Sequence, residues 1–329
     1  MTQRPGAAEI GKGSLPVLML NEAEVERLID LRALLDGLAE GFRAMAQGRV
    51  QAPPRPELSV PGKGFSLAMP AWMQGCNLTV KIVNVFEHNL AVGLPNHLAL
   101  IALFDPQTGA PLCVLDGTYI TGVRTAASAV LSVASLARPD ARVATVVGAG
   151  VQGREHLRLL PLVRDFAEIR LASLYPEDAE ALARRFPGVR AVTDIEAAVR
   201  SADVVCLASH AYEPVIRSDW VRPGTHVTSV GYAPPRGELP TDLLERATLY
   251  VETEAAFEPP PVGCAELAGL APSAGIRLGD MLTGTAPGRV SDQQVTVYKA
   301  MGIAMEDMVA AHIAYTAALR DRVGQHVAL

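Results

Sequence analysis

The period of the hydrophobic positions changes along the chain, and this change predicts two kinds of region. Between residues 58 and 115, short apolar runs of strand length are separated by turn signals at residues 61–64 and 105–109. These runs predict four strands, at residues 65–69, 78–86, 99–104 and 112–115. From residue 143 onwards, apolar β-branched runs alternate with helical patterns, which is typical of a parallel, doubly wound sheet.

The alternating region contains several strand-length runs separated by helical patterns. We expect its strands at residues 143–147, 169–174, 189–192, 204–208, 226–231 and 248–251, and helices at residues 176–186 and 195–199. Residues 255–290 are rich in proline and glycine and are expected to be irregular, with a short ordered piece at residues 278–282.

Residues 1–14 are expected to form a loose tail and residues 15–20 a strand. Helical periodicity predicts three further elements. Asn21 is a suitable N-cap for a helix whose apolar stripe continues to Met45, and the prolines of residues 52–56 end it. Residues 119–137 form a second helical pattern. The tail at residues 295–319 is also apolar at helical spacing, and its methionines are expected to pack in a core or a dimer interface.

A glycine-rich turn separates the strand predicted at residues 143–147 from the helical pattern that follows it. The turn matches G-x-G-x-x-G, and the strand before it and the helix after it supply the context that the match requires. Gly148 would permit a tight turn, Gly150 would let the backbone approach a pyrophosphate, and Gly153 would let the helix pack closely on the strand. We therefore predict dinucleotide binding rather than an ordinary glycine-rich turn, with cofactor contacts from Gly148, Gly150, Val151, Gln152 and Gly153.

The choice between NAD and NADP depends on the end of the next predicted strand. An acidic residue there would bind the ribose 2′-hydroxyl, and an arginine beyond it would accommodate a 2′-phosphate. This chain has Ser173 at the strand end, which we predict to contact the cofactor, and Glu177 at the start of the following helix. The strand has no acidic residue at its tip and no arginine after it. The pattern therefore does not decide between NAD and NADP.

Three cations stand at unusual positions. Lys81 lies within an apolar strand, so it is either on an exposed edge or directed into a site. Arg124 is the only cation in the first turns of a small, apolar helix, where a positive charge opposes the helix dipole. It is either a surface arginine or a receptor for a carboxylate, which arginine binds in a bidentate manner. Arg55 stands among three prolines that force an extended backbone.

Composition narrows the classes of function. The chain of 329 residues has a net charge of −6 and no block of lysine and arginine, so nucleic acids and anionic membranes are poor candidates as partners. Four widely spaced cysteines form no C-x-x-C pair, which argues against a zinc site and for reduced structural thiols. The absence of a signal-peptide pattern and of any run of 18 apolar residues predicts a soluble, cytoplasmic protein without a membrane span.

Several phrases between residues 50 and 312 recur together in one known family. They are VKIVNVF at 80–86, GLPNH at 93–97, LDG at 115–117, TGVRTAA at 121–127, VGAGVQG at 147–153, LGDML at 278–282 with PGR at 287–289, and VYKAMGIA at 297–304. Together they resemble the ornithine cyclodeaminase/mu-crystallin family. The phrases around Lys81 and Arg124 and the C-terminal phrase are specific to it, whereas the glycine turn alone is not.

The resemblance implies a fold and an assembly. It implies an α/β protein with a Rossmann domain, expected at residues 126–294, and a second α/β domain for substrate binding and dimerisation. The second domain is built from both chain ends, expected at residues 1–125 and 295–329. The resemblance also implies a homodimer, a nicotinamide cofactor, and a substrate carboxylate surrounded by Arg55, Lys81 and Arg124. Such cations suit a small α-amino or α-imino acid.

The sequence departs from the family at a residue that matters for chemistry. Cyclodeaminases carry an aspartate where this chain has Ala233, in the phrase GYAPPRGEL at residues 231–239. Loss of that carboxylate favours an NAD(P)H-dependent reductase of a small 2-carboxy imine, such as pyrroline- or piperideine-2-carboxylate. The alternatives are a cyclodeaminase of ornithine or lysine that uses Glu238 instead, an amino-acid dehydrogenase, and a crystallin-like protein that binds the cofactor without catalysis.

The expected proton donors are Lys81, His97 and Tyr232. Lys81 would act if burial lowers its pKa, and Tyr232 lies at a strand end where sites of such sheets occur. His97 is either a substrate-binding residue or a structural hydrogen-bonding group, and Asp116 is expected to cap a helix. We accordingly assign catalysis to Lys81, Arg124 and Tyr232, and substrate binding to Arg55, Lys81, Arg124 and His97.

Overall fold

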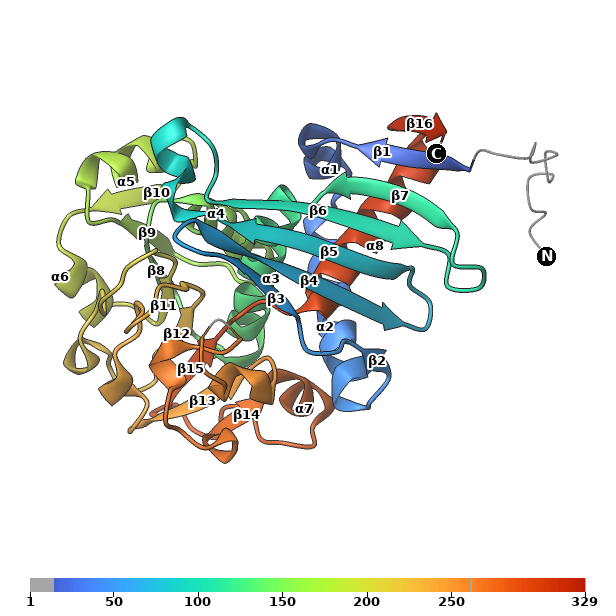
Figure 1. The fold of residues 1–329 in the computed structure, drawn as a ribbon. Coiled ribbons are helices and arrows are strands. Elements are labelled where there is room, and N and C mark those ends of the chain that lie inside the picture. Colours follow the sequence, from blue (N-terminus) through green and yellow to red (C-terminus); the bar gives the residue numbers. More distant parts are fainter. Residues whose placement is uncertain (1–14, 261, 329) are drawn as a thin grey trace. The chain divides into compact units, whose positions relative to one another are not determined.

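The computed structural model describes residues 15–260 and 262–328, so the tail predicted at residues 1–14 lies outside the described residues. The chain divides into two compact units (Figure 1). Unit 1 comprises Met1–Asp30, Gln51–Ile120 and Asp307–Leu329, and unit 2 comprises Leu31–Val50 and Thr121–Glu306. Each unit is described here by itself. Both chain ends contribute to unit 1.

Unit 1 is built on a mixed sheet with a long helix against it. The strands occur in the order β16-β1-β7-β6-β5-β4, and β3 also pairs with β4. Their bounds are β1 Pro16–Leu20, β3 Glu57–Val60, β4 Gly64–Met73, β5 Leu78–Val85, β6 His97–Phe104, β7 Pro111–Asp116 and β16 Gln325–Ala328. Neighbours from β4 to β7 are antiparallel, whereas β1 runs parallel to β7. All four strands predicted between residues 58 and 115 are therefore present.

The two faces of this sheet differ in burial. Along β5, Lys81, Val83 and Val85 are buried, whereas Ile82 and Asn84 between them are exposed. This alternation follows from the two-residue period of a strand. The buried face meets helix α8 (Ala304–Asp321), which hydrogen-bonds to the sheet through His312 Nδ1 and Asn77 Oδ1 at 2.8 Å (Figure 1).

The N-terminal helical pattern forms two helices rather than the single helix predicted. Asn21 caps α1 (Glu22–Leu28) with a full capping box, as its position before two glutamates predicted. The backbone then becomes extended at Ile29, and α2 (Leu31–Ala46) begins a new helix. The prediction of one helix was wrong. The apolar positions of the two helices continue one helical spacing, so periodicity alone does not detect the two-residue break between them.

Unit 2 contains an eight-stranded sheet whose neighbouring strands are all parallel. The order is β10-β9-β8-β11-β12-β15-β13-β14. The strand bounds are β8 Val143–Val147, β9 Glu168–Ala172, β10 Val189–Val192, β11 Val204–Leu207, β12 His226–Ser229, β13 Ala247–Val251, β14 Gly275–Arg277 and β15 Val295–Lys299. The helices are α3 Thr118–Leu136, which begins in unit 1, α4 Val151–Val163, α5 Pro176–Ala183, α6 Ile195–Arg200 and α7 Leu278–Thr283. The predicted doubly wound α/β fold is confirmed.

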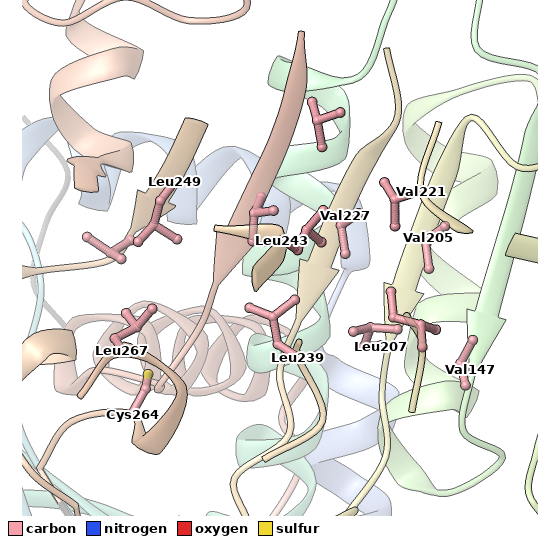
Figure 2. Close-up of a cluster of buried hydrophobic side chains, with 14 of the residues drawn as sticks. Val147, Val205, Leu207, Val221, Val227, Leu239, Leu243, Leu249, Cys264 and Leu267 are labelled. Carbon is pink, nitrogen blue, oxygen red and sulfur yellow. The ribbon is translucent and has the colours of Figure 1, made fainter. Parts of the chain in front are cut away.

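The chain order of this sheet reverses between β8 and β11. From β8 the chain continues through β9 and β10 on one side, and β11 and β12 extend the other side. Ligands of open parallel sheets bind at such a switch point, outside the carboxyl ends of the strands. A cluster of buried side chains that includes Val205, Val227 and Leu249 forms a core along this sheet (Figure 2).

Residues 295–299 form a strand, which corrects the prediction of a helix beginning at residue 295. The run Val-Thr-Val-Tyr-Lys is rich in β-branched residues, and it pairs with β12 and β13 with every side chain buried. Fully buried parallel strands are apolar on both faces, so their sequences do not alternate. The helix itself begins only at Ala304, and Met305 of this helix packs against Gly41 of α2.

The compact units differ from the predicted division at residues 31–50, 121–125 and 295–306, all of which lie in unit 2. Helix α2 belongs to unit 2, where Gly279 of α7 brings its backbone against the carbonyl of Phe42. The functional division into a substrate domain and a nucleotide domain stays a prediction.

Three further features bear on function. Within the described residues, α3 alone is long and apolar enough to cross a membrane, but 83% of its apolar window is buried, as in a core helix of a globular protein. All four cysteines are free, and Cys113, Cys206 and Cys264 are buried. No group of metal-ligating side chains able to hold an ion occurs among the residues that the structure describes.

Candidate active site

The glycine-rich turn lies between the carboxyl ends of β9 and β11, at the switch point of unit 2. The backbone N–H of Gly148 donates to Ala172 O at 2.8 Å, at the end of β9. Gly148 has a φ of +124°, and a Cβ there would collide with the carbonyl of Ala208, which follows β11. Glycine is therefore required at this position both for its conformation and for space.

The rest of the turn fits a pyrophosphate. Gly153 packs directly on the backbone of Gly148, where a Cβ would collide with the carbonyl oxygen. Gly150 is the N-cap of α4, which has no side-chain cap, and a Cβ built on Gly150 meets no atom within 4 Å. An open helix N-terminus with free backbone N–H groups is suited to an anion. These residues therefore have the geometry needed to hold a dinucleotide.

The first turn of α4 also contacts α3. Gln152 Nε2 donates to Gly122 O at 3.2 Å, and Gln152 Oε1 is a buried atom without a hydrogen-bond partner in the described part of the chain. Val151 is an exposed apolar residue at the same turn, and a Cβ on Gly122 would lie 3.0 Å from its Cγ1. The nucleotide turn is thus joined to the segment of α3 that carries Arg124.

Arg124 is buried, so the surface-arginine alternative is wrong. Its side chain is 5% exposed, and Nη1 lies 2.7 Å from Glu306 Oε2. Gly302 leaves space for the guanidinium, because a Cβ at this position would collide with it. A short contact of this kind is a charge-assisted ion pair that fixes the orientation of the guanidinium.

A second carboxylate, that of Glu252, supports the same segment. It accepts hydrogen bonds from the backbone N–H groups of Met301 at 2.9 Å and Gly302 at 2.8 Å. Burial raises the pKa of the Glu252 carboxyl, whereas the Met301 N–H and the charge of Arg124 act in the opposite direction. Tyr298 donates to Glu252 Oε1 at 3.4 Å, and burial raises the pKa of this phenol well above its ordinary value.

Lys81 lies on the buried face of unit 1, so it is not on an exposed edge. Its Nζ is 2.6 Å from Asp307 Oδ2, and both side chains are 1% exposed. A buried ion pair is weak evidence for stability, because removing two charges from water costs about as much as their attraction returns. Stability alone therefore does not explain the pair, and Lys81 stays a candidate for function.

His97 and Arg55 belong to the same unit as Lys81. His97 pairs with Val85 across β5 and β6, which places it on the face that carries Lys81. Its Nδ1 lies 3.1 Å from Asn96 Oδ1. Arg55 is half-buried, and the next residue, Pro56, accepts a hydrogen bond from Ala68, which is adjacent to the register partner of Lys81. The structure therefore brings the segments of these three predicted residues to one region of the sheet.

Tyr232 is half-buried and follows β12, at the carboxyl edge of the unit 2 sheet, as predicted. Ser173 lies directly after β9, where its Oγ accepts a weak hydrogen bond from Tyr175 N at 3.4 Å. Asp116 accepts from Tyr119 N at 2.9 Å, so its predicted role as a helix cap is confirmed. The catalytic and binding roles of the predicted site residues stay predictions.

Glu238 has a structural position that was not predicted. Its carboxylate is buried and accepts from Ser209 N and Oγ, both at 2.7 Å, from Ser229 Oγ at 3.0 Å and from the backbone N–H groups of Val230 and Gly231 at 3.1 and 2.6 Å. Five donors occupy both oxygens. The carboxylate therefore holds the ends of β11 and β12 together and is not directed at a substrate.

A second buried charge reinforces the same edge of the sheet. Lys299, the last residue of β15, donates to Gly231 O at 2.7 Å and to Glu266 Oε1 at 2.8 Å. Burial lowers the pKa of this ammonium, but the charge of Glu266 opposes burial, and the pKa is raised overall. Lys299 thereby links the loop after β12 to the segment around Glu266.

The sequence analysis did not identify the anionic partners of Lys81 and Arg124. Glu306 and Asp307 are consecutive residues of α8, and they are its only acids before Asp321. Two adjacent carboxylates in such an apolar helix are expected to be paired. The same reasoning that selected Lys81 within an apolar strand would also have selected Lys299 at the end of β15.

Comparison with known proteins agrees with this geometry. The sequence model of the ornithine cyclodeaminase/mu-crystallin family matches residues 16–322. The chain is 35% identical over 286 residues to the ketimine reductase mu-crystallin of Mus musculus, which covers 85% of this chain and 90% of that protein.

Two solved structures share the fold over nearly the whole chain. One is the Δ1-pyrroline-2-carboxylate reductase of Thermococcus litoralis in complex with NADH and L-proline, with a TM-score of 0.87, 30% identity and coverage of 94% of this chain and 100% of that chain. The other is an archaeal alanine dehydrogenase dimer with bound NAD, with a TM-score of 0.86, 30% identity and coverage of 95% and 99%.

Proposed function

Because this chain belongs to the ornithine cyclodeaminase/mu-crystallin family, we propose that it is an NAD(P)H-dependent oxidoreductase that reduces the C=N bond of a small 2-carboxy imine. Pyrroline-2-carboxylate and piperideine-2-carboxylate are the substrates that we expect. One observation carries the proposal: the buried Arg124 lies two residues after Gly122, which contacts both Val151 and Gln152 of the nucleotide turn. A carboxylate receptor is thereby built into the helix that contacts the cofactor turn.

The cations would bind and orient the substrate. We propose that Arg124, Lys81 and Arg55 are substrate-binding residues, because guanidinium and ammonium groups form charge-assisted hydrogen bonds with a carboxylate. Glu306 fixes the orientation of the Arg124 guanidinium before substrate arrives. Because the cations are preorganised, little ordering is required at the moment of binding.

The nicotinamide cofactor, when bound, supplies the hydride that reduces the imine carbon. The chain itself must keep the imine nitrogen protonated, because a protonated C=N bond accepts a hydride more readily. Lys81, whose Nζ lies 2.6 Å from Asp307 Oδ2, is the proton donor that we propose. His97, on the same face of the sheet, and Tyr232 are the alternatives.

The structure weakens the case for a cyclodeaminase. Ala233 carries no carboxylate and is buried, and the Glu238 carboxylate that might replace the lost aspartate is occupied by five hydrogen-bond donors. An amino-acid dehydrogenase would use the same cations in the reverse direction. A protein that only binds the cofactor would need neither Lys81 nor Arg124 as a buried cation.

The test is cofactor oxidation with defined imines. NADH or NADPH is mixed with pyrroline-2-carboxylate, piperideine-2-carboxylate, or pyruvate with ammonia or methylamine, and ornithine and lysine are assayed for ammonia release. Oxidation of the cofactor by a cyclic imine would support the proposal. Ammonia release from ornithine without net cofactor consumption would contradict it.

We also propose that the protein is cytoplasmic.

We further propose that two copies of the chain pair through the exposed face of the unit 1 sheet, which is the face opposite Lys81. Ile82 and Leu100 are register partners on this face and are 39% and 52% exposed, and Leu58, 65% exposed, lies on the same face. The remaining side chains of β5 and β6 on this face carry no charge. Exposed apolar faces of this kind are typical of an interface.

The dimer is tested by light scattering of the purified protein. Leu100→Glu should convert the dimer to a monomer, because it places a charge in the centre of the apolar face. Leu319→Glu is the matched control, since Leu319 is 51% exposed on α8, away from this face. A wild-type monomer, or a dimer that persists in Leu100→Glu, would contradict the proposal.

A further inference from the structure

The turn between β9 and α5 lies beside the nucleotide turn. Gly148 N–H donates to Ala172 O, and Ser173 is the next residue. In the neighbouring strand, Val192 is the register partner of Ala172, so Thr193 follows beside Ser173. The adenosine ribose of a dinucleotide is recognised at this end of the second strand. The residues after β9 and β10 therefore decide between a 2′-hydroxyl and a 2′-phosphate.

The charged residues in the first turns after β9 and β10 are all acidic. Glu177 and Asp178 are exposed in the first turn of α5, and Asp194 is the N-cap of α6. No lysine or arginine occurs in residues 173–183. Carboxylates in a first turn interact favourably with the positive end of the helix dipole. The N-terminus of α5 is therefore already neutralised and offers little attraction to a further anion.

The cations of the neighbouring helix α4 have other partners. Arg154 Nε lies 2.7 Å from Glu155 Oε1, and Arg158 Nη1 lies 3.0 Å from Glu155 Oε2. Glu155 is fully buried, so removing either arginine from it would leave a buried charge with less compensation. These ion pairs oppose a movement of either arginine toward a phosphate at the β9 end.

We propose that this chain binds NADH and NAD⁺ in preference to their 2′-phosphorylated forms, and that Glu177 and Asp178 produce the preference through their electrostatic field. Because Ser173 rather than an acid stands at the strand tip, the ribose hydroxyls receive no bidentate carboxylate contact. The preference should thus be moderate, about tenfold in Kd at low salt, and should decrease as salt screens the exposed charges. The inference rests on nucleotide binding by the glycine turn and is independent of which imine is reduced.

The experiment is direct titration with NADH and with NADPH, followed by the fluorescence of the reduced nicotinamide, at about 0.02 M and about 0.5 M salt. NADH should bind about tenfold more tightly at low salt, and the ratio should fall at high salt. Glu177→Gln/Asp178→Asn should tighten NADPH binding about fivefold and leave NADH binding unchanged. Glu180→Gln is the matched control, because Glu180 is an exposed carboxylate farther along the same helix.

Two results would overturn the inference while leaving nucleotide binding intact. These are equal or tighter binding of NADPH by the wild type, and a ratio of the two Kd values that does not change in the double variant. Failure of both nucleotides to bind the wild type would instead contradict the nucleotide site itself, and the inference with it. Because all three substituted carboxylates are exposed, the variants should fold, which thermal unfolding verifies.

Discussion

Replacing Lys81 by methionine tests whether the buried cation of unit 1 is catalytic. Methionine keeps most of the volume of the side chain and removes its charge. Lys81 Nζ and Asp307 Oδ2 are 2.6 Å apart and both side chains are 1% exposed. At an effective dielectric constant of about 20, two unit charges at this distance attract each other by about 6 kcal/mol. Part of this attraction compensates the cost of removing the charges from water.

Two effects of Lys81→Met are therefore expected. Loss of one partner of a buried pair should lower the free energy of unfolding by about 3–5 kcal/mol. Loss of a charge-assisted contact and of a proton donor should lower kcat/KM for imine reduction by about 10³-fold or more. The Kd of NADH should not change, because Lys81 is proposed to contact the substrate and is not one of the residues of the glycine-rich turn.

A double variant separates the two effects. Lys81→Met/Asp307→Asn removes both charges and should recover most of the lost stability, measured by urea unfolding, without recovering activity. If either folded variant retained kcat/KM within about tenfold of the wild type, Lys81 would be a structural residue and the reasoning would be refuted.

The remaining predictions concern stability and the nucleotide turn. Gly153→Ala should abolish NADH binding and lower the melting temperature, because the new Cβ collides with the carbonyl of Gly148; unchanged binding would contradict the proposed turn. Glu238→Gln should lower the free energy of unfolding by about 2–3 kcal/mol in urea titrations, because an amide NH₂ would face hydrogen-bond donors; no loss would contradict the anchoring role. Burial lowers the pKa of His226 to about 3 and of His156 to about 4, below the ordinary value of 6.5. The unfolded chain therefore binds more protons below pH 6.5, and the free energy of unfolding should fall by up to about 1.4 kcal/mol per pH unit for each histidine between pH 6.5 and 4; a flat profile in urea titrations at pH 5 and 7 would contradict their burial as neutral groups.

Local patterns predicted most of the fold because the local and global preferences agree. The alternation along β5 and the strand, turn and helix around Gly148 appear in the structure where the sequence placed them. β15 was not predicted because a strand buried on both faces has no alternation, and its apolar run merges with the helix that begins at Ala304. Its pairing partners β12 and β13 lie more than 40 residues away in sequence, so no local signal identifies it.

The sequence predicted the buried cations of the candidate site but not their anionic partners. An isolated cation in an apolar segment is detectable in sequence, and both Lys81 and Arg124 are buried in the structure. Their partners Asp307 and Glu306 were not found, because ion pairs that span more than 180 residues depend on tertiary structure. The role of Glu238 could not be predicted for the same reason, since its donors come from the ends of two different strands.

The absorbance of the reduced nicotinamide, followed over time with pyrroline-2-carboxylate as substrate, tests the central claim most directly. We predict that the wild-type protein oxidises the cofactor at a rate proportional to enzyme concentration, and that Lys81→Met binds the cofactor but does not oxidise it. Stable absorbance with every imine tested, despite measurable binding of the cofactor, would contradict the assignment of this protein as an imine reductase.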